Sequence, residues 1–181
     1  YEQKSHKLVP VETCMIQNEE AMTAKRIVAE WANLFDIRAF DEKQKSGTLR
    51  QLMVGRTEGG TMAAIVTTGA LPHSDELVSM LKRGLPSLAS CIHGINRNPR
   101  DPGIGSKTEL LFGSAELAET VCGLKFNVGA HSFLQVNPEQ TQKLYLAAAN
   151  ALNLTANDDV ADVFCGIGTI SLLLAQRARS V

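Results

Sequence analysis

The sequence carries almost no net charge, which excludes a strongly basic or acidic surface extending over the whole chain. Among its 181 residues, 18 are lysine or arginine and 19 are aspartate or glutamate, so the formal net charge is −1. Surfaces that hold nucleic acid through its phosphates are typically basic. A nucleic-acid partner would therefore be held mainly by residues outside this chain.

The chain also lacks a long apolar run, internal repeats and low-complexity tracts. Its uncharged apolar stretches are much shorter than the roughly 20 residues that span a bilayer, and its first residues show no signal-peptide pattern. We therefore expect a globular protein with no membrane partner, located in the cytoplasm or, in a eukaryote, in an organelle. The length allows one domain or two small ones.

Metal-binding and redox motifs are missing as well. The four cysteines form no Cys-x-x-Cys pair, so their spacing predicts neither a zinc site nor a redox disulfide. Buried free thiols in a reducing compartment account for them. The histidines share no ligand spacing, and we expect each to be exposed or satisfied in the core; they are His6, His73, His93 and His131.

Residues 1–125 predict a small α+β domain. Extended runs and amphipathic helices alternate in the order strand, helix, strand, strand, helix, strand. This order is typical of the split βαβ (ferredoxin-like) fold, an antiparallel sheet with two helices on one face. The expected helices begin at the N-caps Asn18 and Ser74. The expected strands cover residues 8–14, 48–57, 61–68 and 88–95, with two more near 108–112 and 125–128.

The first of these helices carries an apolar stripe at helical spacing. Trp31, the one tryptophan of the chain, falls on this stripe. Core packing explains its position better than stacking on a nucleic-acid base, because an amphipathic helix normally buries such a face. The residues of the stripe are Ala24, Ile27, Val28, Trp31, Leu34 and Phe35.

A strand, a glycine turn and a helix follow one another near the C-terminus. Residues 160–164 form a short apolar run that predicts a buried parallel strand. Gly166 and Gly168 lack the Cβ atoms that would block a sharp turn or the close approach of a ligand. Nucleotide, dinucleotide and S-adenosylmethionine binders share this pattern, and the dinucleotide fingerprint has a third glycine where this chain has Ser171. Asp162 is expected to orient the turn by accepting backbone N–H bonds.

A second motif precedes this turn. Asn137 is a good N-cap, Pro138 takes the first helical position and Gln140 the third, so a helix is expected to begin here. Gln135 then stands just outside a helix N-terminus, where its amide suits the amino and carboxylate groups of an amino-acid-like cofactor. The residues expected to pack this helix on a sheet are Thr141, Leu144, Tyr145, Ala148, Ala151 and Leu152.

Together the two motifs resemble the RNA 5-methyluridine (uracil-C5) methyltransferase family. They read Phe-x-Gln-Val-Asn-Pro-x-Gln-Thr-x-Lys-Leu-Tyr and Asp-Val-Phe-Cys-Gly-Ile-Gly-Thr-Ile-Ser-Leu. The match is strong over residues 126–181 and looser at residues 49–52 and 62–67. The resemblance implies a central α+β domain over residues 1–125, followed by the first part of a Rossmann-like methyltransferase domain in a longer protein.

The resemblance also implies a chemistry. A cysteine thiolate adds to carbon 6 of a uracil in RNA, carbon 5 attacks the methyl group of S-adenosylmethionine, and a base removes the carbon-5 proton. The nucleophile, the base and the acid that holds the cofactor ribose belong to a portion beyond residue 181, and Cys165 is not the nucleophile. Ribosomal RNA is favoured over transfer RNA as the substrate.

Site residues carry over from the family position by position. Gln135 is expected to contact the methionine end of the cofactor, and Phe133 to help hold a flipped base or to pack under the turn. The residues expected around the cofactor turn are Phe164, Gly166, Gly168 and Thr169. Thr169 departs from relatives that have asparagine there. Cys14 matches the fourth iron–sulfur ligand of some family members, a role that needs three further cysteines upstream.

Two other classes stay open at this point. A nucleotide-cofactor oxidoreductase would use the same turn, with an acidic residue about twenty positions beyond it. A non-enzymatic RNA-binding split βαβ module would show a basic or aromatic sheet face, of which the expected strands offer little.

Overall fold

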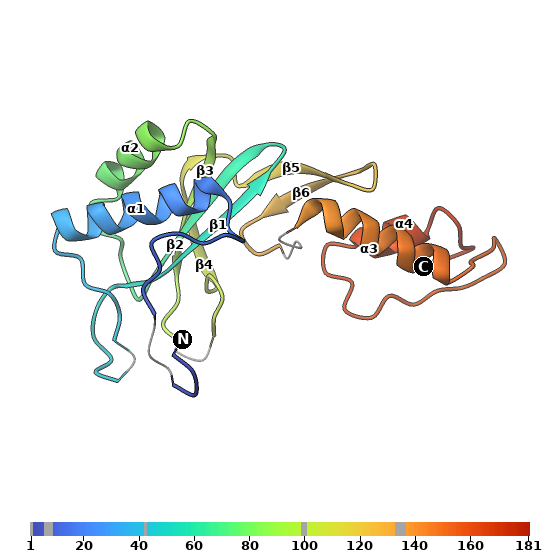
Figure 1. The fold of residues 1–181 in the computed structure, drawn as a ribbon, viewed down its shortest axis with the longest axis horizontal. Coiled ribbons are helices and arrows are strands. Elements are labelled where there is room, and N and C mark those ends of the chain that lie inside the picture. Colours follow the sequence, from blue (N-terminus) through green and yellow to red (C-terminus); the bar gives the residue numbers. More distant parts are fainter. Residues whose placement is uncertain (1, 6–8, 42, 99–100, 133–136) are drawn as a thin grey trace.

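The computed structural model describes residues 2–5, 9–41, 43–98, 101–132 and 137–181. A four-stranded sheet with two helices forms one end of the molecule, and a β-hairpin links it to two further helices (Figure 1). In chain order the elements are α1 (Glu19–Leu34), β1 (Leu49–Thr57), β2 (Gly60–Thr67), α2 (Ser74–Gly84), β3 (Leu88–Ile95), β4 (Lys107–Gly113), β5 (Glu116–Val121), β6 (Leu124–Gly129), α3 (Pro138–Ala151) and α4 (Thr169–Leu174). None of the described helices has the length and apolar content needed to cross a bilayer.

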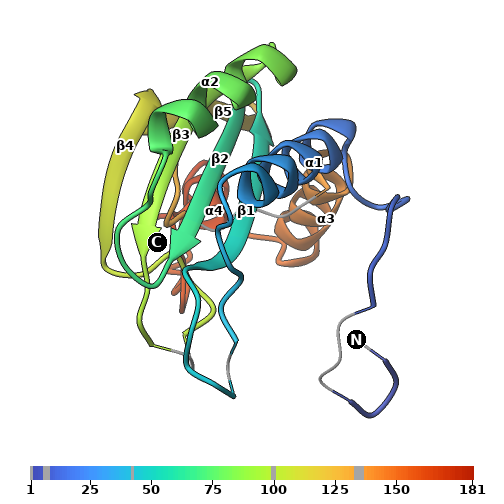
Figure 2. The ribbon, with the colours of Figure 1, turned by 90° about the vertical axis from the view of Figure 1, so that its left-hand side faces the viewer.

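The α/β class predicted from the sequence is confirmed, but the split βαβ topology is wrong. The sheet has the order β1-β2-β3-β4, in which β2 and β3 are parallel and the outer pairs are antiparallel. Helix α2 makes the crossover between the two parallel strands, and α1 lies beside it on the same face (Figure 2). The topology differs because residues 9–14 form no strand. Val9 and Val11 are about half exposed there, at 49 % and 52 %.

Helix α1 begins as predicted. The Asn18 side chain accepts a hydrogen bond from the Ala21 amide at 2.7 Å, and two glutamates occupy the first turn. Trp31 is fully buried, as expected for a core residue, and its indole Nε1 donates to the carbonyl of His73 at 3.0 Å. Leu34 was expected on the buried stripe, but it is 67 % exposed. Leu34 is the last residue of α1. At this end of the helix Phe35, rather than Leu34, packs against the core.

Helix α2 starts at Ser74, the predicted cap residue, so its N-cap lies one position earlier than predicted. His73, not Ser74, is the N-cap residue; it has a left-handed backbone (φ 51°) and makes no side-chain cap bond. Its ring stacks on Phe35 at 4.1 Å between centroids, while its carbonyl accepts the Trp31 indole. These long-range contacts with α1 hold His73 at the helix start, and local capping preferences did not reveal them.

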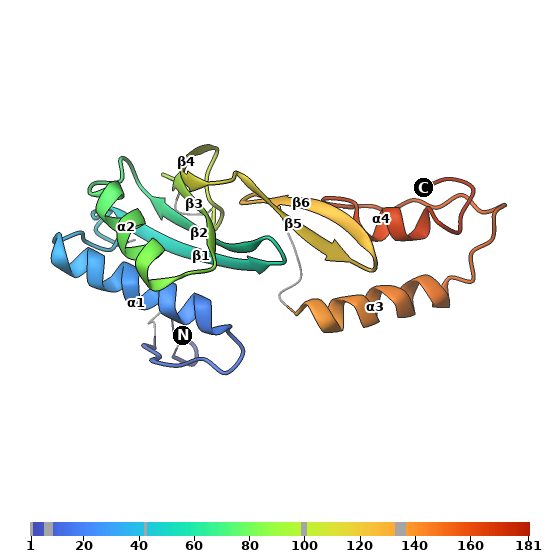
Figure 3. The same ribbon diagram turned by 90° about the horizontal axis from the view of Figure 1, so that it is seen from above.

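A short hairpin, β5–β6, connects the sheet to the C-terminal helices (Figure 3). Strand β5 was not predicted. The turn of the β1–β2 hairpin is hydrogen-bonded to it, since the Gly59 amide donates to the Ala118 carbonyl at 2.9 Å. The nearly buried carboxylate of Glu119 accepts the amides of Glu58 at 3.2 Å and Thr120 at 3.0 Å. The domain boundary expected near residue 125 stays a prediction; the hairpin spans it.

The loop that follows β3 folds back over the sheet face opposite the helices. Ile104 is buried in that face, and Asn96 holds the loop by donating to the carbonyls of Asp101 at 3.0 Å and Gly103 at 2.8 Å. A Cβ atom on Gly94 would collide with the side chain and the carbonyl oxygen of Ile104. Gly94 is therefore required for this close packing.

We expect Gly94→Ala to lower the free energy of unfolding by about 1–3 kcal/mol, because the loop or the strand must shift to admit the methyl group. Gly55→Ala is the matched control: this strand glycine would meet nothing within 4 Å. Chemical denaturation of both variants measures the difference. Equal stabilities would show that Ile104 does not need the space above Gly94.

His93 is nearly buried on β3, which agrees with the expectation of a core-satisfied histidine. The Thr67 hydroxyl donates to the Gly69 carbonyl at 2.6 Å, so it accepts from Nε2 of His93 at 2.7 Å. Nδ1 lies 3.9 Å from a carboxylate oxygen of Glu109, which is largely exposed. Burial lowers the pKa of His93 below its usual value, and Glu109 offsets part of this effect.

Because the pKa of His93 is lower in the folded protein than in the unfolded chain, the unfolded chain binds more protons below about pH 6.5. Stability is therefore expected to fall as the pH drops from 7 to 5, by at most about 1.4 kcal/mol per pH unit for this one group. His93→Gln, which keeps a donor for Thr67, should reduce the slope. Denaturation midpoints of both proteins at several pH values test this; an unchanged slope contradicts it.

Candidate functional site

The apolar run at residues 160–164 does not form the buried strand that was predicted. One parallel β-bridge joins Asp159 to Ser180, with the Val160 amide donating to the Ser180 carbonyl at 3.0 Å. Val163 and Phe164 are 72 % and 98 % exposed. A parallel strand buried on both faces needs neighbouring strands and a helix layer on each side, and in the described part of the chain residues 160–164 have neither.

The residues flanking this bridge are held by charged hydrogen bonds. Arg179 pairs with the Asp159 carboxylate through both Nε and Nη2, and the Ser180 hydroxyl donates to it at 2.6 Å. These contacts, Arg179 first, lower the pKa of Asp159. Bonds from the amide and hydroxyl of Thr155 likewise lower the pKa of Asp158. The exposed side chains of Asp158 and Asp159 thus hold a turn and a bridge, respectively.

The predicted glycine turn is present and leads directly into α4. Phe164, Gly166 and Gly168 all have left-handed backbones, with φ values of 69°, 59° and 83°. The Gly168 amide closes the turn by donating to the Cys165 carbonyl at 2.9 Å. A left-handed conformation is uncommon for a bulky residue such as phenylalanine, and residues held in such regions cluster at ligand sites.

The space around the two glycines is open. A Cβ atom built on Gly166 or Gly168 would meet no atom within 4 Å. Cys165 is exposed beside them, and Thr169, the first residue of α4, is half-buried. The turn therefore presents backbone to open space, which a ligand can approach closely.

Asp162 has a different partner from the one expected. Instead of accepting backbone N–H bonds in the turn, its carboxylate accepts the hydroxyl of Ser171 in α4 at 2.6 Å. In the sequence, Ser171 stands out only because a dinucleotide site would have glycine at this position. The bond therefore connects the segment before the glycine turn to the helix after it.

Helix α3 begins as predicted, but it buries a different face. The Asn137 side chain accepts the Gln140 amide at 3.1 Å, and Pro138 is the first helical residue. Thr141 and Ala149 are buried and Tyr145 is half-buried, one turn apart in each case. The expected packing of four further residues is wrong, since these residues are exposed: Leu144, Ala148, Ala151 and Leu152.

The helices that follow the two motifs share one small core. Ala149 of α3 packs with Leu173 and Leu174 of α4, and Leu124 of β6 lies against the same cluster (Figure 3). Helix α3 thus packs on α4 and the hairpin rather than on a broad sheet. Gln135 and Phe133 lie outside the described residues, so their contribution to the site stays a prediction.

The cysteines form no metal centre in the described residues, where no group of three or more potential ligand side chains occurs. All four are free. Burial raises the pKa of the Cys91 thiol to about 12, so it is unreactive. Cys14 is half-buried, outside any strand, and its role as an iron–sulfur ligand stays a prediction. Cys165 is exposed, contrary to the expectation of buried thiols.

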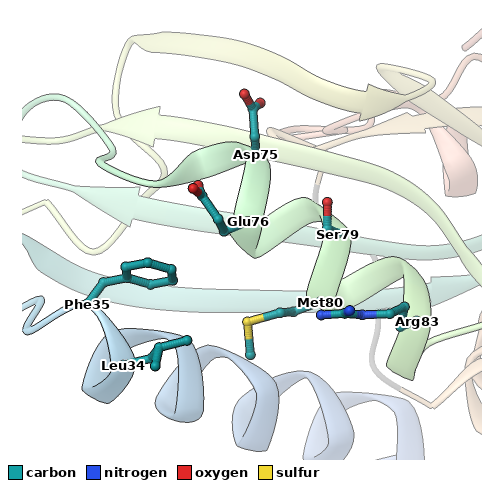
Figure 4. Close-up of a pocket in the computed structure, with 7 residues that line it drawn as sticks. All are labelled: Leu34, Phe35, Asp75, Glu76, Ser79, Met80 and Arg83. Atoms are coloured by element: carbon teal, nitrogen blue, oxygen red, sulfur yellow. The ribbon is translucent and has the colours of Figure 1, made fainter.

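A groove of about 340 Å³ lies between α1 and α2 (Figure 4). Leu34, Phe35 and Met80 form its apolar side, with carboxylates at one end and Arg83 at the other. Of the residues expected to bind the cofactor, those that the structure describes (Phe164, Gly166, Gly168 and Thr169) do not line it, and the sequence did not predict this groove. The groove belongs to the helix layer of the sheet, at the opposite end of the molecule from α4 (Figures 1 and 3).

No protein-family model matches the chain. It is similar to a protein of Halalkalibacterium halodurans named an uncharacterized RNA methyltransferase, with 39 % identity over 184 aligned residues that cover all of this chain and 40 % of that protein. Similarly named proteins of Caldanaerobacter subterraneus and Clostridium acetobutylicum are 37 % and 35 % identical over the same length, again covering all of this chain and 41 % and 40 % of each relative. The chain thus spans about two fifths of the length of these relatives.

The fold is similar to that of a solved structure, the Pyrococcus abyssi tRNA (uracil-54, C5)-methyltransferase in complex with S-adenosyl-L-homocysteine. The TM-score is 0.76 at 20 % sequence identity, over 97 % of this chain and 42 % of that one. At this identity the likeness concerns the fold, which agrees with the predicted α/β class. The match of the whole chain to its curated relatives confirms the resemblance to RNA methyltransferases that the two motifs predicted.

Proposed function

We propose that this chain is part of an enzyme that transfers a methyl group from S-adenosylmethionine to carbon 5 of a uridine in RNA. Similarity over the whole chain to relatives named RNA methyltransferases supports methyl transfer to RNA. The similar fold of an enzyme solved with S-adenosyl-L-homocysteine, which is S-adenosylmethionine without its methyl group, supports the cofactor. The observation that carries the proposal is the open two-glycine turn ahead of α4.

The turn fits a cofactor of this kind. Gly166 and Gly168 leave free volume where side chains would otherwise stand, and the exposed ring of Phe164 beside them offers an apolar face to an adenine. Thr169 adds a hydroxyl at the start of α4. When bound, the cofactor supplies an electrophilic methyl group on a sulfonium; the residues of this chain bind and orient it.

Gln135 and Phe133 complete the proposed site. Gln135 precedes the Asn137 cap by two residues, and its amide can both donate to a carboxylate and accept from an ammonium group. Phe133 is proposed to hold the flipped target base. We place the cysteine nucleophile and the general base outside this chain. Cys165 stands in the cofactor turn, where its thiol donates to the Gly166 carbonyl at 3.8 Å.

The direct test is methyl transfer by the full-length protein, using S-adenosylmethionine labelled in the methyl group and unmodified ribosomal or transfer RNA. We expect label in 5-methyluridine, with ribosomal RNA as the preferred substrate. Label in transfer RNA alone would change the substrate but not the reaction. Absence of label from every uridine of both RNAs would overturn the proposed function.

In the same protein, Gln135→Ala is expected to weaken S-adenosylhomocysteine binding about tenfold or more, because a hydrogen bond to a charged group contributes roughly 1.5–3 kcal/mol. The control is Gln142→Ala, which removes an exposed glutamine of α3. Isothermal calorimetry measures both affinities. Equal affinities for wild type and Gln135→Ala would remove this residue from the site.

Gly168→Ala tests whether the open space at the turn is used. Gly123, in the turn of the β5–β6 hairpin, is a matched control: its φ is 79°, against 83° for Gly168, and a Cβ on either glycine meets nothing within 4 Å. Both alanines should therefore cost about 1–2 kcal/mol of stability through backbone strain. Only Gly168→Ala should weaken S-adenosylhomocysteine binding. Equal affinities in the two variants would contradict a cofactor site here.

A further inference from the structure

One side-chain hydrogen bond spans the whole cofactor turn. The Ser171 hydroxyl, in the first turn of α4, donates to Oδ2 of Asp162 at 2.6 Å. Both side chains are half-buried. The bond ties the segment before the turn to the helix after it and encloses Phe164, Gly166 and Gly168.

Among the described residues, few other contacts fix the conformation of the turn. Its glycines touch no neighbouring atoms at the Cβ positions, and the ring of Phe164 is 98 % exposed. Within the turn, the Gly168 amide donates to the Cys165 carbonyl at 2.9 Å. Glycine has the largest backbone freedom to lose on ordering. A polar bond across the turn therefore restricts segments that side-chain packing leaves free.

Ser171 occupies the position where a dinucleotide site has its third glycine. That glycine permits close packing of the helix on the strand. Here the position carries a hydroxyl instead, and the hydroxyl reaches the carboxylate on the opposite side of the turn. A glycine could not make this bond, so the turn of this chain is held in a different way.

We propose that Asp162 and Ser171 are positioning residues, which hold the glycine turn in the conformation that binds the cofactor. The proposal rests on the cofactor site of the proposed function and adds two residues that stabilise its shape. Neither residue needs to touch the ligand. Losing their bond lets the turn sample other conformations, and the ligand must then select the competent one at the expense of affinity.

The test compares three variants of the full-length protein. Ser171→Ala removes the hydroxyl, Ser171→Thr keeps it, and Ser180→Ala removes an equally short bond, 2.6 Å to Asp159, from the neighbouring bridge. Calorimetry with S-adenosylhomocysteine gives the affinity, and thermal unfolding without ligand gives the stability. We expect about tenfold weaker binding for Ser171→Ala, recovery to within about twofold for Ser171→Thr, and unchanged binding for Ser180→Ala.

Each outcome supports or overturns the inference. Wild-type affinity in Ser171→Ala overturns it, and so does an equal loss of affinity in Ser180→Ala, which would reflect general destabilisation. A loss in Ser171→Ala that Ser171→Thr does not recover also overturns it, because the hydroxyl would then not be the cause. If the wild-type protein binds no S-adenosylhomocysteine, the proposed cofactor site fails, which is a separate result.

Discussion

Packing of two helices on one face of the four-stranded sheet is the interaction on which the rest of the structure depends. Trp31 and Val28 of α1 and Leu77 of α2 are buried against Ile65 of β2. With that face covered, the opposite face receives the loop that carries Ile104 and the strand that carries Leu117. Strand β5 is thereby fixed on the sheet, and the hairpin it forms with β6 supports the C-terminal helices.

The C-terminal part is held by a different balance of forces. In the part of the chain that the structure describes, its core contains three buried apolar residues, Ala149, Leu173 and Leu174, whereas ten form the core beneath the helix layer. Burial of so little apolar surface contributes correspondingly little stability. Hydrogen bonds of charged and hydroxyl groups therefore contribute a larger share of the stability of this part: Arg179 and Ser180 hold the bridge, and Ser171 holds the turn.

Elements with a clear local signal could be predicted from the sequence. Helix α1 has both its Asn18 cap and its apolar period, the β1–β2 hairpin has paired glycines, and residues 88–95 form β3 as expected. The glycine turn is present because Gly166 and Gly168 are the residues that adopt left-handed backbones most readily.

The predictions that failed depend on contacts distant in sequence. Strand β5 (Glu116–Val121) buries the polar Glu119 instead of following a regular apolar–polar alternation, and it pairs with β6 and meets the turn of another hairpin. The apolar run at residues 160–164 has strand-like composition, but while Val160 packs against the core of α3 and α4, Val163 and Phe164 are exposed. His73 replaces Ser74 as a cap through contacts with α1. No local pattern carries such information.

The candidate site shows the same division between local and distant signals. The sequence located the turn but left several cofactor classes open, because strand–glycine–helix turns serve all of them. In this chain the turn is spanned by a hydrogen bond between residues nine positions apart, Asp162 and Ser171, which the short motif does not reveal. A glycine motif indicates where the backbone can approach a ligand closely. A side chain that fixes this motif raises the population of the binding-competent conformation before the ligand binds. A larger population of that conformation gives the same glycine motif a higher affinity for its ligand.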